Sequence, residues 1–139
     1  MIKIATIGML DDAKLNSTLT SESAVANYTF LTNNGIVYLV ANTVTGDDSY
    51  VYDVTFAAGE MLNGWQLDAW VGQKLIVDEK HIAYASGADY DDLTAGTTLL
   101  KINANGKLEV TSTAPESGNY FKVTNKVYLT EKAVEVVII

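Results

Sequence analysis

The feature that most constrains the fold is an asparagine–glycine turn between two segments of high β propensity. Asn34-Gly35 lies between residues 28–32 and 36–42, and both segments are rich in β-branched and aromatic residues. A two-residue hairpin turn requires positive φ angles, which asparagine and glycine adopt at little cost. The pattern therefore predicts a tight antiparallel hairpin, and Asn103-Ala104-Asn105-Gly106, between residues 97–102 and 107–110, predicts a second hairpin.

Other segments alternate apolar and polar residues with the period of two that a half-buried strand requires. Thr124-Asn125 predicts a third hairpin turn, and Gly64 predicts the end of a helical turn within residues 57–64. The predicted strands comprise residues 2–6, 28–32, 36–42, 49–58, 65–70, 75–77, 81–85, 97–102, 107–110, 120–123, 126–130 and 133–139. Short strands separated by turn signals are typical of a β-sandwich or a β-barrel.

The predicted fold is all-β, a compact antiparallel β-barrel or β-sandwich of about ten short strands. The chain has 139 residues, of which 48% are hydrophobic and 19% are charged, so a single domain over residues 1–139 is expected. Residues 9–26 contain many small polar side chains. They predict an extended N-terminal arm or long loop, or a short helix capped by Ser21, and the arm or loop is favoured.

Residues that carry out chemistry are scarce. Cysteine is absent, which excludes disulfides and thiolate metal sites, and His81 is the single histidine. No serine lies in a nucleophile motif, and no glycines form a phosphate-binding loop. His81 is therefore expected to be a strand-end or surface residue. We expect a protein that is not an enzyme and has no catalytic residue, no cofactor and no metal site.

Acidic residues outnumber basic ones. The chain has nine lysines, no arginine and 17 acidic residues, which gives a net charge of −8. Contacts to phosphate depend on lysine and arginine, so we expect no nucleic-acid partner and no anionic membrane partner. The carboxylates of Asp89, Asp91 and Asp92 could hold Ca²⁺, but they lack the spacing of an EF-hand loop and more closely resemble a solvated acidic loop. The first residues do not resemble a secretory signal, so synthesis in a cytoplasm is expected.

The C-terminal segment points to assembly. Residues 134–139 are strongly β-prone and would promote aggregation as an open edge, so they are predicted to pair within the domain or with a neighbouring chain. The loose segment at residues 9–26 is a second candidate for contacts between subunits. The residues predicted to form an interface are Met9, Leu10, Leu15, Trp65, Trp70, Val136 and Ile138.

Three stretches carry a resemblance to a known class of proteins. They are the start at residues 4–14 with Gly8-Met9-Leu10, the segment 63–75 and the segment 95–108. Their spacing resembles the small virion structural proteins of tailed phages, in particular auxiliary capsid proteins. The resemblance spans most of the chain.

This resemblance implies a head decoration (cement) protein on the outer capsid surface of the virion, made in the host cytoplasm. Such a protein binds the major capsid protein of the expanded head and stabilises the contacts between capsomers. It would act as a homo-oligomer, with a trimer favoured, because several weak contacts sum to firm attachment. Two other classes remain open: a phage tail-tube, connector or fibre-associated β domain, and a carbohydrate- or surface-binding β-sandwich, for which eight tyrosines and two tryptophans could supply the binding face.

Overall fold

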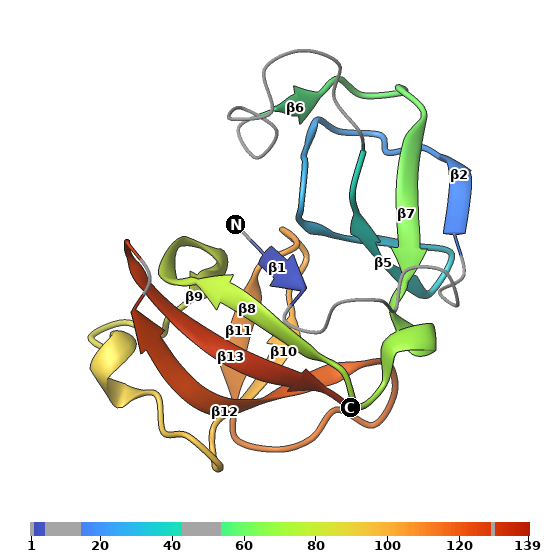
Figure 1. Cartoon of the computed structure of the whole chain (residues 1–139). Helices are drawn as coiled ribbons and strands as arrows, with labels where there is room; N and C mark the ends of the chain where they lie inside the picture. The colour runs from blue at the N-terminus through green and yellow to red at the C-terminus, as the bar shows by residue number, and fades with distance from the viewer. Residues whose placement is uncertain (1, 5–14, 43–53, 129) are drawn as a thin grey trace.

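The largest sheet is curved and contains seven strands (Figure 1). The computed structural model describes residues 2–4, 15–42, 54–128 and 130–139. In spatial order the strands of this sheet are β1 (Ile2–Ile4), β8 (Lys74–Asp78), β13 (Lys132–Ile138), β12 (Tyr120–Tyr128), β10 (Leu99–Ile102), β11 (Leu108–Thr111) and β9 (Ile82–Ala83). All described neighbours are antiparallel except β11 and β9, which are parallel. The sheet is a half-barrel with β1 and β9 at its two edges.

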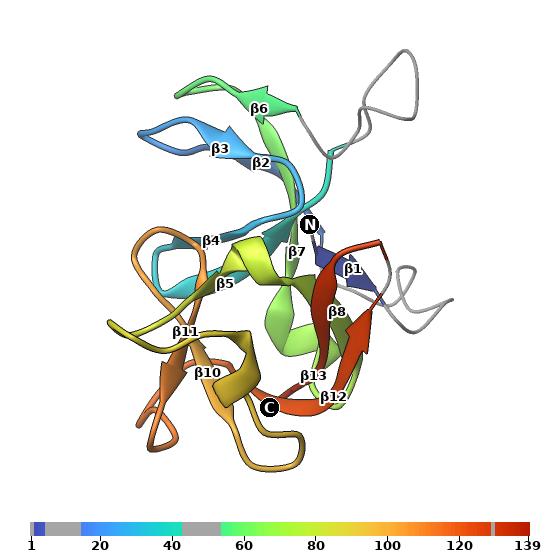
Figure 2. The same ribbon diagram turned by 90° about the vertical axis from the view of Figure 1, so that its left-hand side faces the viewer.

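A second sheet and a short ribbon complete the fold. The four-stranded sheet has the order β2 (Leu15–Leu19), β7 (Leu62–Gln66), β5 (Ile36–Val40) and β4 (Phe30–Asn33). The ribbon pairs β3 (Val25–Ala26) with β6 (Thr55–Phe56). Figure 2 shows the ribbon above the four-stranded sheet and the seven-stranded sheet below it. Three short 3-10 helices are also described, namely η3 (Leu67–Trp70), η4 (Glu79–His81) and η5 (Tyr90–Asp92).

The four-stranded sheet is covered on both faces. Val37 and Leu39 of β5 point toward the main core, which they share with the seven-stranded sheet. Tyr38 and Val40 point the other way, into a smaller core closed by the ribbon. A strand buried on both faces needs apolar residues at consecutive positions, which explains why β5 reads as an unbroken apolar run.

The two asparagine–glycine hairpins are confirmed. Asn34 and Gly35 have φ angles of 50° and 76°, and β4 pairs with β5 in the register that this turn dictates. Gly106, with a φ angle of 76°, lies in the turn that joins β10 to β11. The expected all-β class is confirmed for the described residues, which contain no α-helix.

The C-terminal strand pairs within the chain. β13 lies between β12 and β8, so both of its edges are hydrogen-bonded to strands of the same sheet. Val134, Val136 and Ile138 are fully buried in the main core. Of the two expected pairings, the structure contains the one within the domain.

The third predicted hairpin turn is wrong. Thr124 and Asn125 lie inside the nine-residue strand β12, where the register shifts at a bulge between Val123 and Asn125. The Thr124 hydroxyl donates to the carbonyl oxygen of Glu135 at 3.1 Å and to its carboxylate at 2.8 Å. Pairing with β13 along its whole length therefore outweighs the local turn preference of this dipeptide.

Two further predictions between residues 57 and 70 are wrong. Gly64 does not end a helical turn but lies in β7, where an added Cβ would be 2.5 Å from Leu19 Cδ2 and 3.0 Å from Tyr38 Cβ. The predicted strand at residues 65–70 ends at Gln66 and continues as η3. Side chains three positions apart eclipse one another in a 3-10 helix, so Leu67 and Trp70 are both buried.

The described part of the predicted arm is folded. Residues 15–19 form β2, which pairs with β7, and residues 25–26 form β3 of the ribbon. Residues 9–14 lie outside the described residues. So does the first half of the predicted strand at residues 49–58; in its described half Thr55 and Phe56 form β6.

Candidate binding groove

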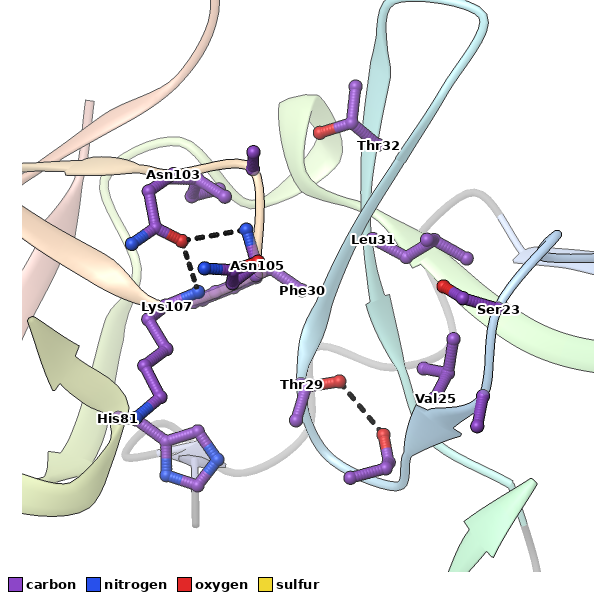
Figure 3. A pocket seen from close by; sticks show the side chains of 15 residues that line it. Ser23, Val25, Thr29, Phe30, Leu31, Thr32, His81, Asn103, Asn105 and Lys107 are labelled. Atoms are coloured by element: carbon purple, nitrogen blue, oxygen red, sulfur yellow. Dashed lines mark hydrogen bonds between the residues drawn. The ribbon is translucent and has the colours of Figure 1, made fainter. Parts of the chain in front are cut away.

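A groove of about 480 Å³ lies beside the four-stranded sheet. Figure 3 shows the strand β4 between the turn that leads from Asn103 to Lys107 on one side and the segment around Ser23 and Val25 on the other. Asn103, Lys107 and His81 therefore come from the seven-stranded sheet and its connections, whereas the other wall comes from the ribbon. The groove is formed where the two halves of the fold meet.

The turn between β10 and β11 is held by one side chain. The Asn103 Oδ1 atom accepts hydrogen bonds from the backbone N–H groups of Asn105 at 2.9 Å and Lys107 at 3.1 Å. The backbone N–H of Asn103 donates to the Lys107 carbonyl at 2.8 Å. This network fixes the backbone at Lys107, whose side chain runs along the wall toward His81 (Figure 3).

Gly106 brings this turn into contact with β4. A Cβ atom at Gly106 would overlap the carbonyl oxygen of Phe30, and the backbone φ of Gly106 is +76°. Only glycine combines this conformation with such a close approach to another backbone. The turn therefore contacts the edge of β4 through backbone atoms, which defines the width of the groove at Phe30.

His81 and Asp78 form a hydrogen-bonded pair at the groove. The His81 Nδ1 atom lies 2.7 Å from Asp78 Oδ1. Burial lowers the pKa of His81 below 6.5, and the hydrogen bond to Asp78 opposes this effect only in part. Burial alone raises the pKa of Asp78, but the His81 hydrogen bond and nearby positive charge bring it below 3.8. The pair is thus a neutral imidazole that donates from Nδ1 to a carboxylate, which places the imidazole lone pair on Nε2.

The His81 pair predicts a pH-dependent stability. Because the folded-state pKa of His81 is below 6.5, the unfolded chain binds a proton first as the pH falls. The free energy of unfolding should therefore decrease as the pH falls from 6.5 through the lowered pKa, and Asp78 should add a further decrease below 3.8. Urea unfolding of the wild type and of His81→Gln over this range measures the effect. The variant should lose the first decrease and show a smaller second one, because the His81 hydrogen bond helps to lower the pKa of Asp78. A wild type that becomes more stable below 6.5 contradicts the assignment.

The groove differs in charge from the rest of the molecule. Its 15 lining residues include one lysine and one histidine but no carboxylate, although the chain carries 17 acidic residues. Three other lysines pair with glutamates: Lys74 with Glu135, Lys80 with Glu131 and Lys101 with Glu109. Within the described ranges Lys107 has no carboxylate partner. The groove therefore presents positive charge on an acidic protein.

The predicted interface residues fall into three groups. Leu15 is 49% exposed on the edge strand β2, opposite the half-buried Trp65. Trp70, Val136 and Ile138 are buried in the main core, so their side chains contact this chain and are not available to a partner. The reason is that Trp70 faces inward from η3, and Val136 and Ile138 occupy the inner face of a central strand. Met9 and Leu10 lie outside the described residues.

The tryptophan pair does not form an open platform for a sugar. The rings of Trp65 and Trp70 stack with centroids 6.2 Å apart and planes inclined by 26°. Because Trp70 is buried, it supports Trp65 from below and offers no second exposed ring. Of these two rings, only that of Trp65 could contact a sugar.

The acidic residues near position 90 serve a structural purpose. The Asp89 carboxylate accepts from the Asp91 backbone N–H at 2.8 Å, and the Asp92 carboxylate accepts from the Asp89 backbone N–H at 2.9 Å. These bonds form a capping box on η5. The Tyr90 hydroxyl donates to the Ala133 carbonyl at 2.7 Å, which attaches the loop to β13. Among the described residues no three histidine, aspartate or glutamate side chains are grouped to hold a metal ion.

Sequence reasoning did not identify the groove. His81 comes from a different segment than the turn that holds Asn103 and Lys107, and the glycine of that turn was interpreted only as a hairpin signal. Comparison of the chain with protein-family models, curated proteins and solved structures yields no match. In the part of the chain that the structure describes, no helix has the length and apolar character needed to cross a membrane.

Proposed function

We propose that this chain is a non-catalytic structural protein of a tailed phage, a decoration protein that binds the outer surface of the expanded head. Its partner is the major capsid protein, and it acts as a homo-oligomer, with a trimer favoured. The resemblance of residues 4–14, 63–75 and 95–108 to auxiliary capsid proteins supports this assignment. The net charge of −8 fits a protein that must not bind the packaged nucleic acid.

The observation that carries the proposal is the edge strand β2. No described strand pairs with its outer side, and its first residue, Leu15, is exposed beside Trp65. An edge strand with unpaired backbone groups is a natural template for another protein chain, and Leu15 adds an exposed apolar side chain to it. Tryptophan is enriched among the residues that contribute most of the binding energy of protein interfaces, and Trp65 lies next to Leu15. One such contact is small, so oligomerisation is needed to give firm attachment.

The proposal predicts that Leu15 contributes to head binding. Purified protein is mixed with expanded heads and with unexpanded precursor shells of the encoding phage, and the bound fraction is measured by co-sedimentation. The wild type should bind expanded heads only. Leu15→Glu should weaken binding about tenfold or more, since a charge replaces a buried apolar contact at a cost above about 1.4 kcal/mol.

Val110→Glu is the matched control, because Val110 is an apolar residue of similar exposure, 41%, on the strand β11. It should bind as the wild type does. Both variants should keep the wild-type melting temperature, since neither side chain is buried. Equal binding to both kinds of shell contradicts the proposal. So does assembly of the isolated protein into rings or tubes, which is the behaviour of a tail protein; sedimentation equilibrium detects this and tests for the trimer.

A further inference from the structure

The backbone of β4 presents hydrogen-bonding groups to the groove. Across a two-residue hairpin the pair next to the turn, Asn33 and Ile36, is hydrogen-bonded, and every second residue of the strand then points its N–H and C=O away from the partner strand. By this alternation Phe30 and Thr32 point away from β5. The bond from the Val40 N–H to the Thr29 carbonyl, at 2.9 Å, fits the same alternation.

This outer edge is accessible at one of the two positions. No described strand pairs with it, and Phe30, Leu31 and Thr32 all line the groove. At Phe30 the carbonyl oxygen is in contact with Gly106. Thr32 is exposed and lies beyond that contact. An extended segment can therefore exchange backbone hydrogen bonds with Thr32, which is the arrangement of strand addition at a sheet edge.

The side chains around this edge select for charge. Lys107 on the wall is an ammonium donor, and no carboxylate lines the groove to compete for it. At pH 7 His81 is uncharged, because its pKa is below 6.5, so it adds no charge that selects for or against an ion. Asn103 and Asn105 add amide groups that bind polar atoms of either kind. A segment that carries a carboxylate thus gains an ion pair in this groove, whereas a basic segment meets Lys107.

We propose that the groove binds an extended acidic peptide segment of a partner protein, which adds to the edge of β4 at Thr32 and places a carboxylate on Lys107. The inference rests on the proposed function only in requiring a protein partner. It also defines a contact separate from β2, because β4 and β2 lie at opposite edges of the four-stranded sheet. Two separated contacts on one protomer allow it to bridge two partner molecules.

The test is a nuclear magnetic resonance titration of the full chain with a blocked hexapeptide of alternating glutamate and valine. Its control is the same peptide with glutamine in place of glutamate. We expect the Thr32 amide and the residues from Asn103 to Lys107 to shift, with a dissociation constant of about 1 mM or lower. The Thr32 amide should also exchange more slowly with solvent when the peptide is bound.

Two substitutions separate the two parts of the site. Lys107→Glu should weaken binding of the acidic peptide by roughly fivefold or more, and it should remove the preference over the glutamine peptide. Lys122→Glu, on β12 and outside the groove, makes the same charge change and should have no effect. Thr32→Pro removes the outward N–H without removing a bond to β5, which edge strands tolerate, and should abolish the binding, as measured by the loss of the peptide-induced shifts from Asn103 to Lys107.

Several results overturn the inference. They are shifts on another surface, equal binding of the two peptides to the wild type, or no shift at Thr32 up to about 10 mM peptide, which would place the dissociation constant well above the expected value of about 1 mM. If Thr32→Pro unfolds, the comparison of Lys107→Glu with Lys122→Glu still tests whether the groove binds the acidic peptide. Because the titration uses no phage heads, its failure leaves the head-binding result unchanged, and a failure of head binding leaves the groove result unchanged.

Discussion

Replacement of Phe30 by alanine is expected to lower the free energy of unfolding by about 3–5 kcal/mol, as for other buried phenylalanines. Phe30 belongs to β4 of the four-stranded sheet, but its side chain lies in the main core. Its ring packs on Phe121 of β12, with centroids 5.3 Å apart. The substitution would leave a cavity between the two sheets, where neither can close without moving the other.

Urea unfolding provides the measurement, and Tyr128→Ala is the control. Tyr128 is also an aromatic residue on a strand, but its side chain is 75% exposed, so its removal should change stability by no more than about 0.5 kcal/mol. A domain of ordinary stability has only about 5–15 kcal/mol in total, so the Phe30 variant should unfold at clearly lower urea. Equal midpoints for the two variants would show that the sheets are not joined through Phe30.

Local signals in the sequence were sufficient where local conformation decides the structure. The Asn34-Gly35 turn was predicted because its positive φ angles are a property of those two residues. The C-terminal strand was predicted because a strongly β-prone segment of that length would promote aggregation unless it is paired. The partners of the C-terminal strand were not predictable. It pairs with β12, which is close in the sequence, and with β8, which is distant, and both strands present suitable edges.

Predictions were wrong where distant contacts outweigh local preference. Thr124-Asn125 is a dipeptide typical of a turn, yet the hydroxyl of Thr124 bonds to Glu135 across the strand pair and the strand continues through a bulge. A glycine such as Gly64 is typical of a helix end, yet here its missing side chain leaves room for Leu19 and Tyr38. In both cases the deciding partner lies more than ten residues away along the chain. A single sequence contains no local trace of such a partner.

The groove could not be predicted from local sequence signals for the same reason. Its walls come from the ribbon, from β4 and from the β10–β11 turn, and each segment alone reads as an ordinary strand or hairpin. His81 was expected to be a strand-end or surface residue, and it does lie at the end of η4 next to β9. Its partner Asp78 is only three residues away in the sequence, but its place near Lys107 follows from the pairing of β9 with β11. Only the positive φ of Gly106 is a local property, and it indicates a turn without indicating what the turn contacts.

Replacement of Gly106 by alanine is therefore expected to have the second large effect. The positive φ alone costs a non-glycine residue about 1–2 kcal/mol. The added methyl group would also overlap the Phe30 carbonyl oxygen, which is a backbone atom and cannot rotate away as a side chain can. Forcing such an overlap costs about another 1–3 kcal/mol. The turn should move away from β4, so the amide signals of Phe30 and Lys107 should shift together.

Gly118→Ala isolates the part of this effect that comes from contact with β4. Gly118 has a φ angle of +81°, close to that of Gly106, but nothing lies within 4 Å of the added Cβ. Gly118→Ala should show only the cost of the positive φ angle. The free energy of unfolding of Gly106→Ala should therefore be lower than that of Gly118→Ala by about 1 kcal/mol or more. Equal losses in urea unfolding would mean that the turn yields freely and that β4 does not need it. A larger loss at Gly106 means that the wall of the groove is part of the contact that joins the two sheets, so a ligand bound there acts on the stability of the whole fold.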